Sequence, residues 1–198
     1  MKRLLPFVLL VLVLSACGSS THRKQASAEA ARPSCPSAWR EGWQKLANRV
    51  GAPVYCPSWV PPEINARIGG IYTDINSVDR DHSYLISFVW FESGSGEVHV
   101  NFRGYPGQTR IPTCSDLDTD KPVPCFADFK GIVHTGDLSA RVYTANQGVD
   151  QWHILYLWRH NGSLYTVSMH VAFPYTYSEV AHALKRMLSG LVLIKPES

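Results

Sequence analysis

The residues best suited to chemistry are two histidines, His153 and His170, on either side of an Asn161-Gly162 pair. Asn-Gly between alternating apolar residues is a strong signal for a two-residue β-hairpin turn. Such a turn pairs Arg159 with Leu164, and the same register places His153 directly opposite His170. Because cross-strand Cβ atoms lie about 4.5–5.5 Å apart, the two imidazoles are close enough to share one metal ion.

A catalytic zinc ion needs at least a third ligand and an open position. His99 or an aspartate from another strand is a candidate for that ligand, but nothing in the sequence places either of them beside the pair. The alternative is that both imidazoles lie on a solvated sheet face beside Thr166 and Ser168. Both interpretations stay open.

Asp116, Asp118 and Asp120 alternate like the start of a calcium-binding loop. An EF-hand requires Gly at the sixth position and Glu at the twelfth, and this chain has Lys121 and Ala127 there. The sequence therefore excludes an EF-hand and leaves an irregular calcium site or a solvated acidic loop.

Other catalytic and cofactor motifs are absent from the sequence. It contains no nucleophile elbow, P-loop, zinc-protease helix or dinucleotide-binding glycine motif. We therefore predict a function without catalysis and without a cofactor.

The first seventeen residues indicate export. Lys2 and Arg3 precede the apolar stretch 4–14, which is too short to span a bilayer but fits a signal peptide. The stretch ends in Leu14-Ser-Ala-Cys17 and resembles the bacterial lipobox. The resemblance implies cleavage before Cys17 and lipid attachment to it, and thus an anchor on the extracytoplasmic side of the cell membrane. An ordinary secretory signal would instead leave Cys17 as an unpaired thiol.

The composition indicates a globular protein. The chain has 198 residues, of which 45% are hydrophobic and 18% charged, which excludes a disordered chain. The formal net charge is only +3, and no basic stripe follows the signal, so we expect no nucleic-acid partner. We predict a signal peptide over 1–16, a lipidated cysteine and flexible tether over 17–33, and one domain over 34–198.

Four further cysteines predict two disulfides in an extracytoplasmic protein. A helix over 37–50, with Ser37 as its N-cap, followed by an extended return over 51–56, brings Cys35 and Cys56 together. Cys114 then pairs with Cys125.

Alternating residues predict a hairpin of strands 84–92 and 97–104 around Ser93-Gly-Ser-Gly96. The predicted register pairs Glu92 with Glu97 and places Val98, Val100 and Phe102 on the core face, opposite Phe91, Val89 and Ser87. The other face is mixed, and we predict it as an interaction surface formed by Trp90, Phe88, His99, Asn101 and Arg103.

The remaining pattern completes an α+β fold. Strands are predicted over 139–146, 151–159, 164–173 and 191–194, and Thr176 with Glu179 forms a capping box for a helix that ends at Ser189. We expect an antiparallel sheet of five to seven strands, with one helix from each end of the chain packed on it.

The second half resembles a domain of unknown function found in bacterial envelope proteins. The resemblance rests on the stretch from Ala140-Arg-Val-Tyr through Trp158-Arg-His-Asn-Gly-Ser-Leu-Tyr to the helix start Ser178-Glu-Val-Ala. Trp59-Val-Pro-Pro62 is similar to the proline-containing opening of that domain. The expected architecture also resembles that of periplasmic lipoprotein carriers and sigma-factor regulators. These motifs are structural and imply a fold more than an activity.

We therefore expect a membrane-anchored binding or interaction module of the cell envelope. Its expected partners are the membrane, through the N-terminal lipid, and an envelope protein or an apolar ligand. One alternative is a carrier that encloses a lipid or other apolar ligand between the sheet and the C-terminal helix. The other is a metal-binding protein or metal-dependent enzyme built on His153 and His170.

Overall fold

The structure, a computed structural model, describes residues 32–62, 76–92, 96–145 and 153–197. The chain divides into two units, residues 1–31 and Arg32–Ser198, and every described residue belongs to the second unit. The predicted signal peptide, Cys17 and most of the predicted tether lie outside the described residues.

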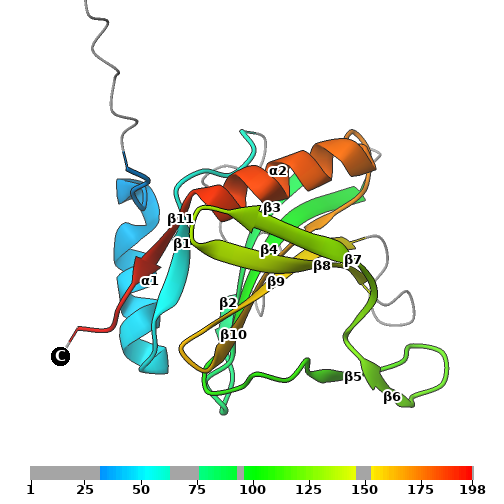
Figure 1. Ribbon diagram of the computed structural model, residues 1–198, viewed down its shortest axis with the longest axis horizontal. Helices are drawn as coiled ribbons and strands as arrows, with labels where there is room; N and C mark the ends of the chain where they lie inside the picture. Colours follow the sequence, from blue (N-terminus) through cyan, green and yellow to red (C-terminus); the bar gives the residue numbers. More distant parts are fainter. Residues whose placement is uncertain (1–31, 63–75, 93–95, 146–152, 198) are drawn as a thin grey trace, which may run out of the picture. The chain divides into compact units, whose positions relative to one another are not determined.

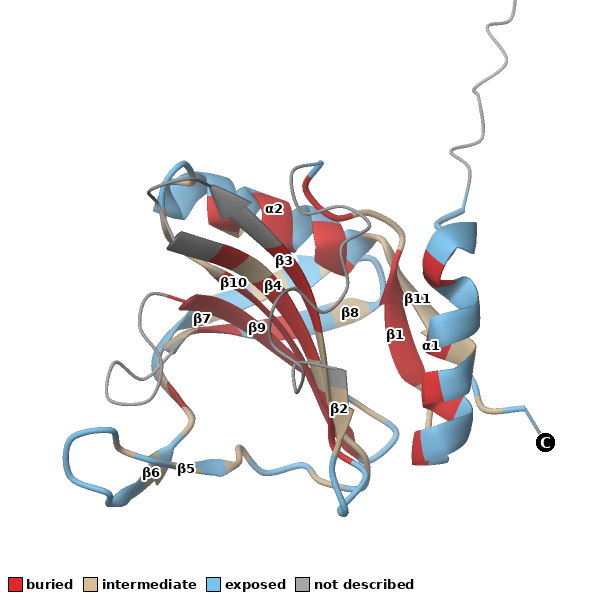
Figure 2. Cartoon of the chain, turned by 180° about the vertical axis from the view of Figure 1, so that it is seen from behind, coloured by how far each residue is buried: buried red, intermediate tan, exposed pale blue. Residues whose placement is uncertain are grey.

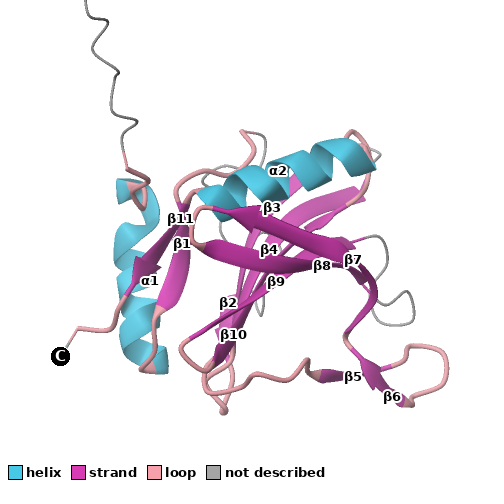
Figure 3. Cartoon of the chain, viewed as in Figure 1, coloured by secondary structure: helices cyan, strands magenta, loops and turns pink. Residues whose placement is uncertain are grey.

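The predicted α+β class is confirmed (Figure 3). The described residues form two helices, α1 (Ser37–Val50) and α2 (Tyr177–Ser189). The strands are β1 (Val54–Pro57), β2 (Asn76–Val78), β3 (Tyr84–Glu92), β4 (Gly96–Tyr105), β5 (Thr113–Ser115), β6 (Pro122–Pro124), β7 (Phe126–Thr135), β8 (Leu138–Ala145), β9 (His153–His160), β10 (Ser163–His170) and β11 (Leu191–Ile194).

Seven strands form one antiparallel sheet in the order β2-β3-β4-β10-β9-β8-β7. Two smaller two-stranded sheets pair β1 with β11 and β5 with β6. The β1–β11 pair lies beside α1, whereas α2 crosses the large sheet (Figure 1). Strands from both halves of the chain meet at β4 and β10, so the sheet is continuous across the middle of the sequence.

Helix α1 covers the β3–β4 part of the sheet with two tryptophans. Trp39 contacts Phe88 edge-on, and Trp43 contacts both Phe88 and Phe102, with ring centroids 5.0 to 6.3 Å apart. The predicted span of α1 is confirmed, and it ends at Gly51 in the left-handed conformation. The predicted Ser37 N-cap is wrong by one residue, because Pro36 precedes the first turn and its carbonyl accepts the first helical hydrogen bonds.

Both predicted disulfides are confirmed. Cys35 and Cys56 are bonded with their Cα atoms 5.6 Å apart, and Cys114 and Cys125 with theirs 4.9 Å apart. The first bond joins the start of α1 to β1. The second closes the chain segment that forms β5 and β6.

Helix α2 begins at the predicted capping box. The Thr176 hydroxyl accepts a hydrogen bond from the Glu179 amide, and the Glu179 carboxylate accepts one from the Thr176 amide. One side of the helix is buried against the aromatic core of the sheet, where Tyr156 donates a hydrogen bond to the Ala181 carbonyl. The buried residues of α2 are Val180, Ala183, Leu184, Met187 and Leu188.

The β9–β10 hairpin has the predicted register. Asn161 and Gly162 both have positive φ, as a type I′ turn requires, and Arg159 pairs with Leu164. On the core face, Ile154, Tyr156 and Trp158 consequently pair with Met169, Val167 and Tyr165. Trp152, the predicted partner of Val171, lies outside the described residues.

The predicted register of the β3–β4 hairpin is wrong by one residue. Glu92 pairs with Gly96 instead of Glu97, so Phe88 pairs with Val100 and Ser87 pairs with Asn101. A shift of one residue moves every side chain to the other face of a strand. The register that forms is the one that buries Phe88 completely under the tryptophans of α1. Figure 2 shows the buried residues concentrated on β3, β4, β9 and β10.

Gly104 supplies a test of this register. It pairs with Tyr84 on one side and Tyr165 on the other, and a Cβ added at Gly104 would overlap the Tyr84 ring. We predict that Gly104→Ala lowers the free energy of unfolding by about 1–3 kcal/mol, the usual cost of overpacking. Denaturant unfolding of the variant measures this change.

A second glycine serves as the control. Gly42 lies on α1, and a Cβ added there would have open space around it. Gly42→Ala should raise the free energy of unfolding by up to about 1 kcal/mol, because alanine is the better helix former. Equal effects of the two variants would contradict the close approach of Tyr84 to Gly104.

Candidate functional site

Three histidines form a row across the middle of the large sheet. His153 pairs with His170, as predicted, and His99 follows one position beyond the Val100–Met169 pair on the neighbouring strand. The ring centroids of His153 lie 4.8 Å from those of both His99 and His170, and the His99–His170 separation is 5.5 Å. The structure therefore brings His99 beside the predicted histidine pair.

The row is held by direct contact between its imidazoles. The Nε2 atoms of His99 and His153 lie 2.7 Å apart, so the Nε2–H group of one ring donates a hydrogen bond to the other. The rings of His153 and His170 are nearly parallel, with an interplanar angle of 10°. No group of three or more His, Cys, Asp or Glu side chains among the described residues is arranged to hold a metal ion.

A second polar row runs beside the histidines. Ser87 pairs with Asn101, which pairs with Ser168, and the Ser87 hydroxyl donates a hydrogen bond to the Asn101 side-chain oxygen. The exposed fractions of these three residues are 2%, 7% and 6%, and that of His153 is 3%. The alternative of a solvated face is thus wrong for His153, Thr166 and Ser168, which are all buried. His99 and His170 are half-buried.

The predicted interaction surface is divided between the two faces. His99, Asn101 and Arg103 alternate along one face of β4, together with the histidine row. Phe88 lies on the opposite face in the core, with an exposed fraction of 0%. The Trp90 side chain lies outside the described part of the structure. The cause is the register shift described above, which exchanges the two faces of β3.

In the acidic loop between β5 and β6, the first aspartate stabilises the turn of the loop. The Asp116 carboxylate accepts hydrogen bonds from the amides of Asp118 and Thr119 and from the Thr119 hydroxyl, at 2.8 to 3.1 Å. These bonds, that of the Thr119 hydroxyl foremost, lower the pKa of Asp116. The carboxylate is therefore used to close the loop, as aspartate commonly does in turns.

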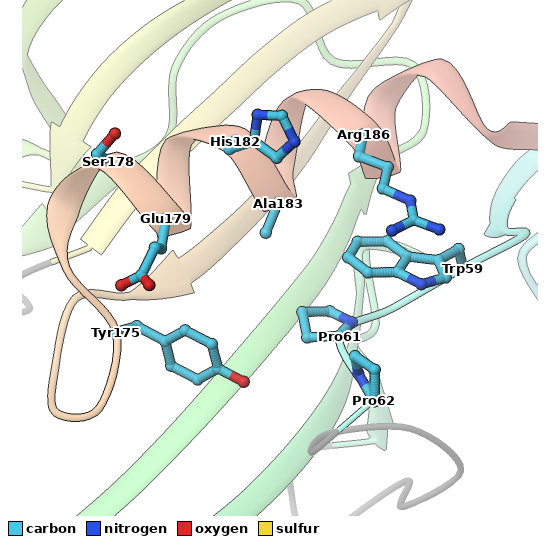
Figure 4. Close-up of a pocket in the computed structure, with 9 residues that line it drawn as sticks. All are labelled: Trp59, Pro61, Pro62, Tyr175, Ser178, Glu179, His182, Ala183 and Arg186. Carbon is cyan, nitrogen blue, oxygen red and sulfur yellow. The ribbon is translucent and has the colours of Figure 1, made fainter.

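A pocket of about 400 Å³ lies beside α2, between this helix and the segment that carries Trp59 and Pro61. Figure 4 shows Trp59 and Pro61 on one side, Tyr175 and Glu179 at the far end, and Ala183 pointing into the space between them. Its volume falls within the range of small-molecule sites, about 300–1,000 Å³. The lining residues are Trp59, Pro61, Pro62, Tyr175, Ser178, Glu179, His182, Ala183 and Arg186.

Pairing at the end of the chain positions the two walls of the pocket. β1 pairs with β11, which follows α2 directly, and the Ser58 amide donates a hydrogen bond of 3.0 Å to the Gly190 carbonyl. This bond ties the segment that carries Trp59 to the C-terminal end of α2. The Arg186 guanidinium lies 3.8 Å from the centre of the Trp59 ring, in a cation–π contact.

The opposite end of the pocket carries a negative charge. Hydrogen bonds from the Thr176 amide and hydroxyl lower the pKa of Glu179, so its carboxylate stays ionised at the helix N-terminus. The pocket thus has an acidic end at Glu179 and a basic end at Arg186. Sequence reasoning missed it because Trp59 and Arg186 are far apart in the chain, although the Trp59-Val-Pro-Pro62 motif contains one of its walls.

Comparisons with protein-family models, with curated proteins and with solved structures gave no match to this chain. No helix within the described ranges is long and apolar enough to cross a membrane.

Proposed function

We propose that this chain is a membrane-anchored extracytoplasmic lipoprotein that acts as a non-catalytic binding module, with its ligand site in the pocket on α2. The observation that carries this proposal is the pocket itself, in which aromatic and proline walls are combined with a few polar groups. That combination is typical of ligand sites. The lipobox-like residues 14–17 support the membrane anchor.

The packing of the core favours this pocket over the space between α2 and the sheet. Tyr156 contacts α2 from the sheet through its hydrogen bond to the Ala181 carbonyl, and Leu184 and Met187 of the helix belong to the same buried cluster. Tyr156, Leu184 and Met187 are each at most 3% exposed. The pocket beside α2 therefore offers an apolar ligand or a partner side chain more room than the core does.

The electrostatics of Glu179 do not favour its use as a general acid. A carboxylic acid that donates a proton near neutral pH needs a raised pKa. The capping box lowers the pKa of Glu179 instead. This carboxylate therefore serves to start the helix, and the pocket is proposed to hold its ligand without reacting with it.

Blocking the pocket tests the proposed site. Ser178 lies exposed at the edge of the pocket, so a tryptophan there should cover the opening without disturbing the core. We expect small aromatic compounds to shift the Trp59 indole signal in nuclear magnetic resonance spectra of the full-length chain in non-ionic detergent, and Ser178→Trp to abolish these shifts.

The matched control is Lys185→Trp, at an exposed position of the same helix that does not line the pocket. This variant should keep the Trp59 shifts. If the compounds instead act on residues of the histidine row, or bind both variants equally, the pocket is not the ligand site.

The membrane anchor has a test of its own. Expression in bacteria supplied with an alkyne-bearing fatty acid should label the chain, and Cys17→Ala should remove the label and release the protein from the membrane fraction. An unlabelled wild-type chain would contradict lipid attachment at Cys17 and leave the binding site unaffected.

A second candidate function is the binding of a divalent transition-metal ion such as Zn²⁺. It is favoured by the position of His99 beside His153 and His170. Two nitrogens on a tetrahedral zinc ion lie about 3.3 Å apart, given Zn–N bonds of about 2.0–2.1 Å. The ion would therefore have to replace the hydrogen bond between His99 and His153 and separate the two Nε2 atoms from their present 2.7 Å.

Calorimetric titration of the full-length chain with Zn²⁺ distinguishes this candidate. It predicts binding of one ion per chain, lost in His170→Ala and retained in His134→Ala, which alters an exposed histidine on β7. Titration of the wild-type chain without binding would exclude the metal function.

A further inference from the structure

We infer that the ligand of the pocket on α2 is an organic anion, a carboxylate or phosphate monoester carried on a flat apolar group, and that Arg186 binds its charge. This inference rests on the proposed function and adds the chemical class of the ligand. It follows from the contact of the Arg186 guanidinium with Trp59, from the position of the Glu179 carboxylate and from the apolar residues that line the pocket.

The Trp59 ring fixes the guanidinium without using its hydrogen-bond donors. A guanidinium stacked on an aromatic face, here at 3.8 Å, keeps its N–H groups in its own plane and free to point sideways. Those donors match the two oxygens of a carboxylate or phosphate. The stacking therefore orients Arg186 before a ligand arrives, which lowers the entropic cost of binding an anion.

The charge of Arg186 is not neutralised by a neighbouring carboxylate. In the described ranges, the ion pair that forms joins Lys45 to Glu41 on α1, and none involves Arg186. Glu179 lines the same pocket, but it lies seven residues earlier on the helix, about 10.5 Å along its axis. Its carboxylate accepts the hydrogen bonds of Thr176, so the basic end of the pocket is available for an external anion.

Further donors lie on the same side of the helix. Ser178, His182 and Arg186 follow one another at four-residue spacing, which places them in one line along α2, and all three are exposed. Trp59, Pro61 and Tyr175 lie on the other side of the pocket and offer flat or rigid apolar surfaces, and the Ser178 and His182 side chains point away from them and lie at the edge of the pocket (Figure 4). A ligand that presents an anion to the helix and a flat apolar group to this wall satisfies both sides.

Benzoate and phenyl phosphate are suitable probes, with benzamide as the neutral counterpart of the same shape. We expect both anions to shift the Trp59 indole signal of the full-length chain in non-ionic detergent, and to bind at least tenfold more tightly than benzamide. Arg186→Gln should weaken the binding of both anions at least tenfold and leave the affinity for benzamide unchanged. Arg186→Lys keeps the charge but loses the planar donor pair, so it should bind both anions with intermediate affinity.

Arg40→Gln is the matched control, because Arg40 is an exposed arginine on α1 away from the pocket. It should bind all three probes like the wild type. Equal binding of benzoate and benzamide, or anion binding that survives Arg186→Gln, would overturn the anion inference and leave the pocket as a ligand site. If none of the probes shifts Trp59, both the inference and the proposed site fail. Arg186-dependent binding to phosphatidylglycerol vesicles without binding of either soluble anion would overturn the inference in favour of a lipid headgroup.

Discussion

The rest of the structure depends on the antiparallel pairing of β1 with β11, which joins the two ends of the domain. On one side, the Cys35–Cys56 disulfide and a hydrogen bond from the Trp43 indole to the Tyr55 carbonyl fix α1 to β1. On the other side, β11 follows α2 after a single residue. Both helices are therefore held by the same short ladder. Since α1 and α2 pack on different parts of the large sheet, this ladder fixes the positions of both helices.

The large sheet is unusual in burying different chemistry on its two faces. One face is apolar and aromatic and packs under the helices. The other carries a smaller apolar cluster that includes Leu155, Leu157 and Leu164, and beside it a group of polar, almost fully buried residues, Ser87, Asn101, Ser168 and His153. Buried polar groups cost stability unless they are hydrogen-bonded, and the Ser87–Asn101 and His99–His153 bonds meet that requirement for part of the cluster. The polar rows therefore demand a specific register across β3, β4, β10 and β9.

The parts of the fold that could be predicted are those fixed by local signals. The Asn161-Gly162 turn determines its own register, and the capping box at Thr176 determines where α2 begins. The Ser93–Gly96 stretch permits turns of more than one length, and the register was decided by the burial of Phe88 under α1, which local sequence does not reveal. Strand β7 was not predicted because two irregularities near Asp128 and Gly131, both with positive φ, break its alternation.

The candidate sites likewise differ in how far local sequence could predict them. The pairing of His153 with His170 could be predicted because a single hairpin contains both residues. The approach of His99 depends on the pairing of β4 with β10, which joins segments about sixty residues apart and leaves no local signal. The pocket combines Trp59 with α2 through the β1–β11 ladder, so it follows from the tertiary fold alone.

The β5–β6 hairpin has a further consequence for how this protein can vary. Its two ends are joined by the Cys114–Cys125 disulfide, and the Cys125 amide donates a hydrogen bond to the Pro112 carbonyl just outside the loop. The chain therefore enters and leaves the hairpin at one fixed point, whatever lies between the two cysteines. The residues of this segment are largely exposed and belong to neither helix nor the large sheet. It is thus the place where insertions, deletions or grafted peptides can be accepted while the domain keeps its fold.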